Sequence, residues 1–155
     1  MMLRFFVFLA INFSALAIGS YLMGGSPVEN TFYQTIEKAP WTPPGWVFGA
    51  AWSLIMLCFT FYLTLFTSNQ TFKELYAFYW IFGVQFILNV GWNPTFFYFH
   101  QVFLGLIILL LLIIVIAWFC YIGFQKSKMQ GVLMLPYLLW LLIAFSLNGY
   151  IFLMN

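Results

Sequence analysis

Two tryptophans placed deep inside apolar segments are the residues of this chain best suited to chemistry. Trp52 and Trp140 each lie about two helical turns inside a long hydrophobic segment, whereas Trp and Tyr normally gather at the membrane–water boundary. A buried indole needs an acceptor for its N–H, either from the protein or from a polar ligand. The sequence therefore predicts that Trp52 and Trp140 form flat walls for a planar aromatic molecule.

A second candidate set combines two amides with an aromatic ring. Gln85, Asn89 and Trp92 follow one another at i, i+4 and i+7, so they share one face of a helix. Polar side chains in hydrocarbon need partners. We expect this face to turn inward, and we interpret it as a ligand-contacting face rather than as a purely structural one.

The last apolar segment repeats the same spacing. Trp140, Ala144 and Leu147 lie at i, i+4 and i+7, and Asn148 follows directly. Asn12 lies in the middle of the first apolar segment. For Asn12 and Asn148 we favour a structural role, as hydrogen-bonding contacts between helices worth about 0.6 kcal/mol each.

The remaining polar residues do not assemble a conventional catalytic or metal site. The chain has three acidic residues and one histidine, His100, from which no acid–base pair, triad or metal-ligand set can be built. We interpret His100 as an interfacial side chain rather than an axial haem ligand. The sequence thus predicts no metal and no tightly bound cofactor. It leaves open whether the chain is an enzyme, because any chemistry would depend on a reactive ligand.

The composition indicates the class of protein. Of 155 residues, 65% are hydrophobic, 24% are aromatic and only 5% are charged, compared with about 25% charged in a soluble domain. Such a chain cannot solvate an ordinary surface, so we expect an integral membrane protein, surrounded by lipid, with one domain over residues 1–155. A net charge of +2 gives no indication of nucleic-acid binding.

The predicted fold is an all-α bundle of five transmembrane helices. Hydropathy places the spans near residues 3–23, 44–66, 73–93, 102–124 and 131–153. Pro43 and Pro44 suit the first turn of the second helix, where a missing N–H costs nothing. The long connection 24–43 is expected to fold as a lid over one end of the bundle.

The basic residues predict an orientation in the membrane. Four of the five, Arg4, Lys73, Lys126 and Lys128, fall on the side of the N-terminus in a five-span topology, and only Lys38 falls on the other. By the positive-inside rule, we expect a multi-pass protein of a bacterial plasma (inner) membrane. Its N-terminus would be cytoplasmic and its long first loop outside.

Three motifs carry a resemblance to a known family. They are W-T-P-P-G-W-V-F-G-A-A-W at 41–52, Q-F-I-L-N-V-G-W-N-P-T-F-F at 85–97 and P-Y-L-L-W-L-L-I-A-F-S-L-N at 136–148. In order and spacing the chain resembles a bacterial member of the TspO/MBR family, the translocator proteins or tryptophan-rich sensory proteins, called peripheral benzodiazepine receptors in animals. The resemblance covers essentially the whole chain.

The resemblance implies a five-helix bundle, a homodimer, and a pocket capped by the first loop. Its implied ligands are porphyrins such as protoporphyrin and haem, and synthetic benzodiazepine-type molecules. Carried over by position, the ligand-binding residues are Trp52, Asn89, Trp92, Trp140, Ala144 and Leu147, with Pro44, Phe48, Gln85, Ser20 and Tyr33 as further members. Some bacterial members are associated with light- and oxygen-dependent porphyrin breakdown, which makes Trp52 and Trp140 candidate electron donors to an excited porphyrin.

Several alternatives remain open at this level. The same pocket would serve a transporter of tetrapyrroles or other small molecules, or a sensor whose dimer contacts change when a ligand binds. The sequence identifies neither the physiological ligand nor the dimer interface. The family's proposed sterol motif lacks its basic residue here, because the chain ends F-L-M-N after Tyr150, so we do not carry sterol binding over.

Overall fold

The long apolar segments of the sequence form long helices. The computed structural model describes residues 1–24, 27, 29–68 and 70–155, and within them the regular structure is entirely helical. The elements are α1 Met2–Leu22, α2 Thr31–Thr35, α3 Gly45–Thr67, α4 Tyr76–Asn93, the π-helical turn η1 Pro94–Tyr98, α5 Val102–Lys126 and α6 Lys128–Met154. The predicted all-α class is confirmed, and the predicted spans match the five long helices to within about three residues.

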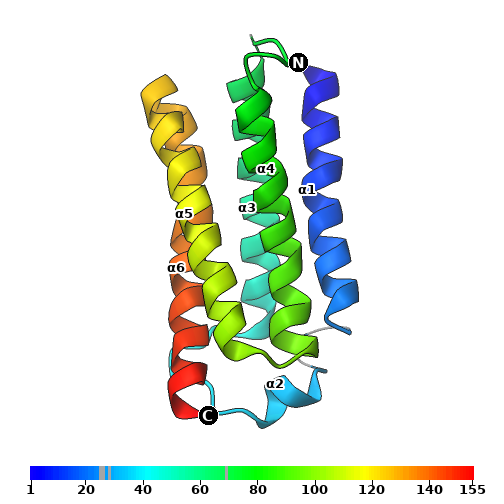
Figure 1. Cartoon of the computed structure of the whole chain (residues 1–155), viewed down its shortest axis with the longest axis vertical. Coiled ribbons are helices and arrows are strands. Elements are labelled where there is room, and N and C mark those ends of the chain that lie inside the picture. The colour runs from blue at the N-terminus through cyan, green and yellow to red at the C-terminus, as the bar shows by residue number, and fades with distance from the viewer. Residues whose placement is uncertain (25–26, 28, 69) are drawn as a thin grey trace.

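The five long helices stand side by side and alternate in direction (Figure 1). Their packing closes a ring, because α1 contacts α3 and α4, α3 contacts α6, α6 contacts α5, and α5 contacts α4. The N-terminus and the C-terminus lie at opposite ends of the bundle. Residues that face the centre of the ring can therefore come from helices far apart in the sequence.

Four of these helices, α1, α3, α5 and α6, are long and apolar enough to cross a membrane. The fifth, α4, is 18 residues long and carries Gln85, Asn89 and Asn93, which lower its hydropathy. A membrane protein with several apolar helices is thus confirmed. The count of five spans stays a prediction, with α4 as the helix in question.

The structure differs from the predicted boundaries at three prolines and one serine. The second long helix begins at Gly45 with Pro44 as its N-cap residue, so Pro43 and Pro44 precede the first turn instead of forming it. Pro94 does not end the helical path, because it opens η1, where its missing N–H costs nothing. A single residue, Ser127, joins α5 to α6, and its hydroxyl accepts a hydrogen bond from the Gln130 N–H at 3.2 Å.

Aromatic rings and a few internal hydrogen bonds hold the middle of the bundle together. Phe59 and Tyr62 of α3 pack against Phe119 of α5 with ring centroids 5.8 and 6.0 Å apart. The Tyr62 hydroxyl donates to the Phe119 carbonyl at 3.0 Å. Asn12 of α1 donates to the Thr60 hydroxyl of α3 at 2.9 Å, and both side chains are buried. Asn12 therefore has the structural role that its mid-span position predicts.

The first connection lies under the end of the bundle that holds the C-terminus (Figure 1). Of its predicted extent, 24–43, residues 25, 26 and 28 lie outside the described part of the chain. Asn30 Nδ2 donates to the Phe97 carbonyl of η1 at 3.1 Å, and the Glu37 N–H donates to Asn155 Oδ1 at 2.9 Å. The Tyr150 hydroxyl donates to the Glu37 carboxylate at 3.1 Å. These bonds attach the connection to both η1 and α6.

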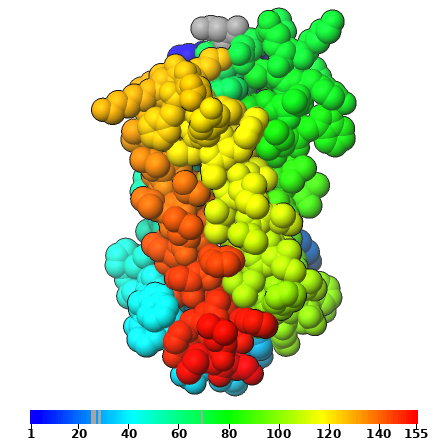
Figure 2. Space-filling model, turned by 60° about the vertical axis from the view of Figure 1, so that its left-hand side comes forward, coloured from blue at the N-terminus to red at the C-terminus, as the bar shows by residue number. Residues whose placement is uncertain are grey.

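The outer surface shows the same arrangement. In Figure 2, α5 and α6 run together along the molecule, and the segment before α3 lies against the last turns of α6. Trp41 in that segment contacts Tyr150 edge to face, with centroids 5.4 Å apart, and its indole N–H donates to the Ser146 hydroxyl at 3.3 Å. The connection therefore covers one end of the bundle, as the predicted lid would.

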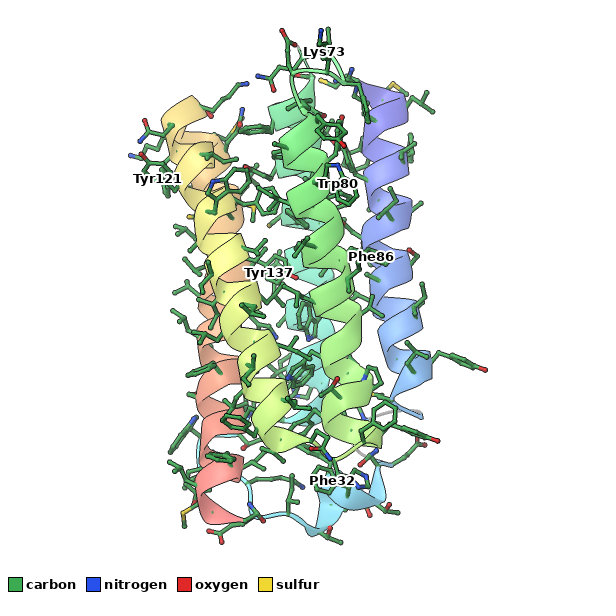
Figure 3. All side chains as sticks on the ribbon, viewed as in Figure 1. Phe32, Lys73, Trp80, Phe86, Tyr121 and Tyr137 are labelled. Atoms are coloured by element: carbon green, nitrogen blue, oxygen red, sulfur yellow. The ribbon has the colours of Figure 1, made fainter. Side chains whose placement is uncertain are left out.

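The opposite end gathers four of the five basic residues. Arg4 lies in the first turn of α1 and donates to the Thr67 carbonyl at the end of α3. Lys73 lies in the α3–α4 connection (Figure 3), and Lys126 and Lys128 flank the α5–α6 junction. The structure thus places these four basic residues at one end of the bundle, as the predicted topology requires. The side of the membrane that each end faces stays a prediction.

Candidate functional site

The two predicted tryptophan walls lie on α3 and α6, which pack against each other. The Trp140 ring, 8% exposed, contacts Phe48 edge to face, with centroids 5.4 Å apart. The half-buried Trp52 ring contacts Tyr137 in the same manner, with centroids 5.8 Å apart. The α3–α6 interface therefore carries two aromatic pairs, each combining one predicted site residue on α3 with a ring on α6.

Gln85 connects α4 to this aromatic group. Its Nε2 donates to the Tyr137 hydroxyl at 2.8 Å, and the two side chains are 2% and 1% exposed. Tyr137, visible near the centre of the bundle in Figure 3, thus contacts Gln85 and Trp52 at once. The amide of Gln85 acts as a link between α4 and α6, and this link fixes the ring beside Trp52.

Trp92 lies closer to the end covered by the first connection. It stacks on Phe96, with centroids 5.4 Å apart and ring planes 13° from parallel, and meets Phe97 edge to face. Its indole Nε1 is buried and has no hydrogen-bond partner within the described residues. A buried N–H without an acceptor is unusual in a native protein, so this nitrogen is available to a ligand or a water molecule.

Asn148 of α6 presents two further unpaired atoms in the same region. Its side chain is 2% exposed, and neither Nδ2 nor Oδ1 has a partner in the described chain. A Cβ atom placed on Gly105 of α5 would come within 3.0 Å of Asn148 Nδ2 and 3.5 Å of Trp92 Nε1. Trp92, Gly105 and Asn148 thus meet, and we call them the polar cluster.

Asn89 of α4 and the remaining predicted residues of α6 also turn inward. Asn89 is 5% exposed and Leu147 7% exposed, whereas Ala144 is half-buried against the core. The Asn89 carbonyl accepts a hydrogen bond from Asn93 Nδ2 at 3.1 Å. A Cβ on Gly19 of α1 would lie 2.6 Å from the same Asn93 nitrogen, so Gly19 allows α1 to approach α4 closely at this level.

Two predicted site residues lie apart from this interior group, and a third, Tyr33, joins it through Phe96 and Phe97, the rings that Trp92 also contacts. Ser20 is exposed on α1, and Pro44 is exposed at the start of α3. Tyr33 lies on α2 and packs its ring against Phe97, with centroids 5.5 Å apart. Burial raises the pKa of the Tyr33 hydroxyl above its ordinary value. Tyr33 therefore belongs to the covering connection, and among the described residues no hydrogen bond or ring contact joins Ser20 or Pro44 to Trp52 or Trp140.

Sequence reasoning missed three residues of this region. Tyr137 lies three positions before Trp140, a spacing that places both on one helix face, but its ring is not distinguished by sequence from other core aromatics. Asn148 was assigned to a structural hydrogen bond that the structure does not contain. Gly105 lies in a nearly featureless apolar run, and only the packing of three helices reveals its place in the polar cluster.

The side chains gathered at this site are of kinds that can contact a ligand. The side chains are aromatic rings, amides and aliphatic groups, and the described part of the chain holds no group of three His, Cys, Asp or Glu residues that could ligate a metal. Flat rings suit a planar apolar ligand, and the unpaired N–H groups of the polar cluster suit a carbonyl or carboxylate of that ligand.

Comparison with known proteins gives a consistent assignment. The model of the TspO/MBR family matches residues 6–154, which is nearly the whole chain. The chain is 36% identical to the tryptophan-rich protein TspO of Archaeoglobus fulgidus over 148 residues, covering 95% of this chain and 91% of that protein. It is 30% identical to the human translocator protein over 139 residues, covering 84% and 78%. It is 27% identical to protein CrtK of Rhodobacter capsulatus over 127 residues, covering 80% and 78%.

Proposed function

The chain belongs to the TspO/MBR family, and on this premise we propose that it is a membrane protein that binds a porphyrin in the half of the bundle covered by the first connection. Protoporphyrin and haem-like tetrapyrroles are the ligand class, and the ligand is also the substrate of a light- and oxygen-dependent breakdown. Trp52, Trp140, Phe48, Ala144 and Leu147 supply apolar contacts to the macrocycle.

The observation that carries this proposal is the polar cluster. Three buried polar atoms without partners, Trp92 Nε1 and both amide atoms of Asn148, lie beside apolar and aromatic walls. Leaving such atoms unpaired costs about 1–3 kcal/mol each, so a ligand that accepts from Trp92 Nε1 and Asn148 Nδ2 is stabilised relative to one that does not. A propionate carboxylate of the porphyrin accepts two hydrogen bonds from these N–H groups. The apolar macrocycle then packs against the aromatic walls.

The position of the tryptophans suggests how breakdown would begin. An indole held against a light-excited porphyrin transfers one electron to it, leaving an indole radical cation and a porphyrin radical anion, and molecular oxygen is the oxidant for the later steps. Trp140 is the better placed donor, because its ring is buried beside Phe48 and thus shielded from competing reactions in water.

The test uses the full chain in detergent with protoporphyrin as the probe. Quenching of tryptophan fluorescence in the dark reports binding, and porphyrin absorbance under light, with and without oxygen, reports conversion. We expect Trp140→Phe and Trp52→Phe to slow conversion at least tenfold while changing the dissociation constant less than about threefold, because phenylalanine keeps most of the bulk but not the easily oxidised indole. Trp80→Phe is the matched control, since Trp80 is 63% exposed and lies toward the other end (Figure 3).

The outcomes separate binding from breakdown. Conversion that is unchanged in both variants contradicts the electron-donor role. Saturable quenching without any conversion leaves a porphyrin-binding protein, and flux through liposomes or ligand-dependent partner binding then becomes the function to measure. Absence of saturable quenching in the wild type refutes the porphyrin proposal itself.

A further inference from the structure

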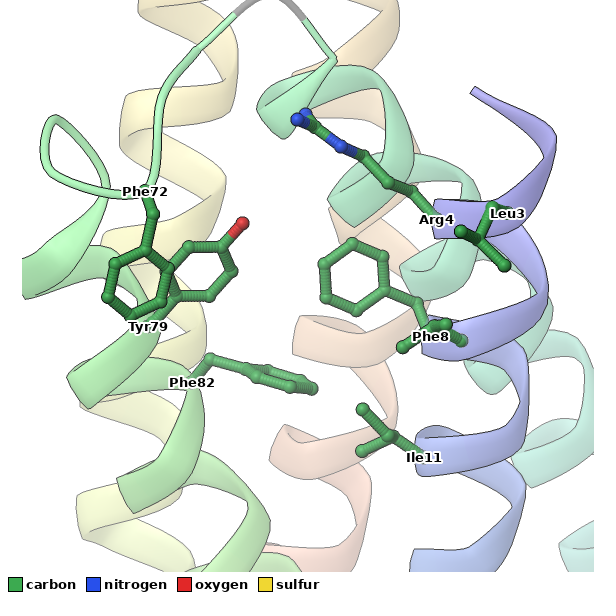
Figure 4. A pocket seen from close by; sticks show the side chains of 8 residues that line it. Leu3, Arg4, Phe8, Ile11, Phe72, Tyr79 and Phe82 are labelled. Atoms are coloured by element: carbon green, nitrogen blue, oxygen red, sulfur yellow. The ribbon is translucent and has the colours of Figure 1, made fainter.

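A groove lies between α1 and α4 at the end of the bundle opposite to the proposed porphyrin site. Its volume is about 430 Å³. The side chains that line it come from the first three turns of α1, from the α3–α4 connection and from the start of α4: Leu3, Arg4, Val7, Phe8, Ile11, Phe72, Tyr79 and Phe82. Figure 4 shows the two walls facing each other across an open space.

The groove is apolar along its length and is built from ordered rings. Phe8 and Phe82 meet edge to face at its base, with centroids 5.8 Å apart. Phe72 stacks on Tyr79, with centroids 5.2 Å apart and planes 18° from parallel. From Leu3 to the end of the α1 wall, eight residues on, the helical rise gives about 12 Å. This shape fits the upper part of one acyl chain.

The groove opens outward rather than into the centre of the bundle. Leu3 is 77% exposed, Val7 47% and Phe72 69%. In a membrane protein such apolar rims face lipid, so the occupant can enter sideways from the bilayer without crossing the covered end. A water-soluble small molecule would have to reach the groove through surrounding hydrocarbon.

One cation lies at the polar mouth of the groove. Arg4 is half-buried, and its guanidinium extends toward the end of α3 (Figure 4), where it donates to the Thr67 carbonyl. A guanidinium has five N–H donors, so donors remain for an anion. Tyr79 points its hydroxyl into the same space (Figure 4).

Among the described residues, no carboxylate forms an ion pair with this arginine. The protein has three acidic residues. Glu29 and Glu37 belong to the connection at the other end, and Glu74 accepts both a backbone and a side-chain hydrogen bond from Thr71, at 2.7 and 2.9 Å. Arg4 therefore has no carboxylate partner in the described part of the chain, and an anion at the mouth of the groove complements it.

We propose that this groove binds an anionic phospholipid from the leaflet that faces the N-terminal end of the bundle. The phosphate accepts hydrogen bonds from Arg4, in the bidentate geometry that guanidinium groups favour, and an acyl chain lies along Phe8, Ile11 and Phe82. This lipid site is independent of the proposed porphyrin site.

The experiment compares phosphatidylglycerol with phosphatidylcholine that carries identical acyl chains. Native mass spectrometry of the purified full chain in neutral detergent counts bound lipids and gives their dissociation constants. We expect phosphatidylglycerol to bind about fivefold more tightly, which is the effect of one cation near a membrane surface. A phosphatidylglycerol with a photoreactive group on its acyl chain should cross-link to peptides of α1 and α4.

Three variants and one control assign the effect to the groove. Arg4→Gln should abolish the preference for phosphatidylglycerol, and Arg4→Lys should restore part of it, since the charge returns without the planar fork. Lys128→Gln removes a cation at the same end but outside the groove and should leave the preference intact. Val7→Trp fills the groove, keeps Arg4, and should weaken binding of both lipids; because Val7 is partly exposed, the variant should fold.

Each contrary result overturns the proposal in a distinct way. Equal losses in Arg4→Gln and Lys128→Gln mean diffuse surface attraction and no site. Displacement of the lipid by inorganic phosphate at similar concentrations means an anion site without an acyl-chain groove. Lipid cross-links that map to helices other than α1 and α4, or unchanged binding in Val7→Trp, mean that the groove is not a lipid site.

Discussion

Replacing Tyr137 by Phe should destabilise the fold through Gln85. The Gln85 Nε2 atom donates to the Tyr137 hydroxyl at 2.8 Å, and both side chains are almost completely buried. The substitution keeps the ring but removes the acceptor, which leaves a buried amide N–H unpaired. That loss costs about 1–3 kcal/mol in a protein interior, while direct couplings between polar pairs of membrane helices average about 0.6 kcal/mol and reach about 1.7 kcal/mol.

A double-mutant cycle separates these two quantities. We expect Tyr137→Phe and Gln85→Leu each to lower the free energy of unfolding by about 1–3 kcal/mol. The double variant should lose less free energy of unfolding than the two single variants lose together, because neither polar group is then left without a partner. The coupling energy should lie near 0.6–1.7 kcal/mol. Unfolding by a denaturing detergent, followed by circular dichroism, measures all four proteins.

The cycle also tests the link to the proposed porphyrin site. Because Phe retains the edge-to-face contact with Trp52, now 5.8 Å between centroids, protoporphyrin affinity in Tyr137→Phe should change less than about threefold. Additive effects in the two single variants, with no measurable coupling, would refute the hydrogen bond as a link between α4 and α6.

Three further predictions follow from close contacts. Gly123→Ala should destabilise the fold, because the added Cβ would lie 2.9 Å from the Tyr62 ring. Gly83→Ala, whose Cβ would have nothing within 4 Å, should stabilise the fold by about 0.5–1 kcal/mol. Equal melting temperatures of the two variants would contradict both expectations. Asn12→Leu should cost about 0.6–1.7 kcal/mol in detergent unfolding, and a stabilised variant would exclude an interhelical role. Tyr150→Phe should leave stability within about 1 kcal/mol but accelerate protoporphyrin release in stopped-flow fluorescence, and an unchanged rate would show that the covering connection does not limit release.

The sequence was a reliable guide to the helices because the bilayer demands a simple pattern. A spanning helix needs about 20 apolar residues, and this requirement located all five long helices. The exceptions have local causes. Thr71 and Glu74 bond to each other in a turn that precedes α4, which begins at Tyr76. The Ser127 hydroxyl caps α6 so early that the expected fourth loop shrinks to one residue.

The site was predicted less completely, because its contacts depend on which helix faces meet. The spacing correctly predicted that Gln85 and Trp140 face inward. Nothing in the sequence indicates that Tyr137 accepts a hydrogen bond from Gln85 or that Asn148 lies without a partner. The groove beside Arg4 was not anticipated at all, since it depends on the distance between α1 and α4. Whether the predicted residues bind a ligand, and whether two chains associate, stays a prediction.

The hydrogen bond between Gln85 and Tyr137 has a consequence for how the protein is made. The two residues are 52 positions apart, and the ribosome adds about 5–20 residues per second. During synthesis, roughly 3–10 seconds therefore pass between the addition of Gln85 and the addition of Tyr137. In that interval, α4, which is not among the four helices apolar enough to cross a membrane by length and composition, has no α6 beside it. We expect insertion machinery or a chaperone to hold α4 until α6 arrives, so that the bundle closes only after α6 has been made.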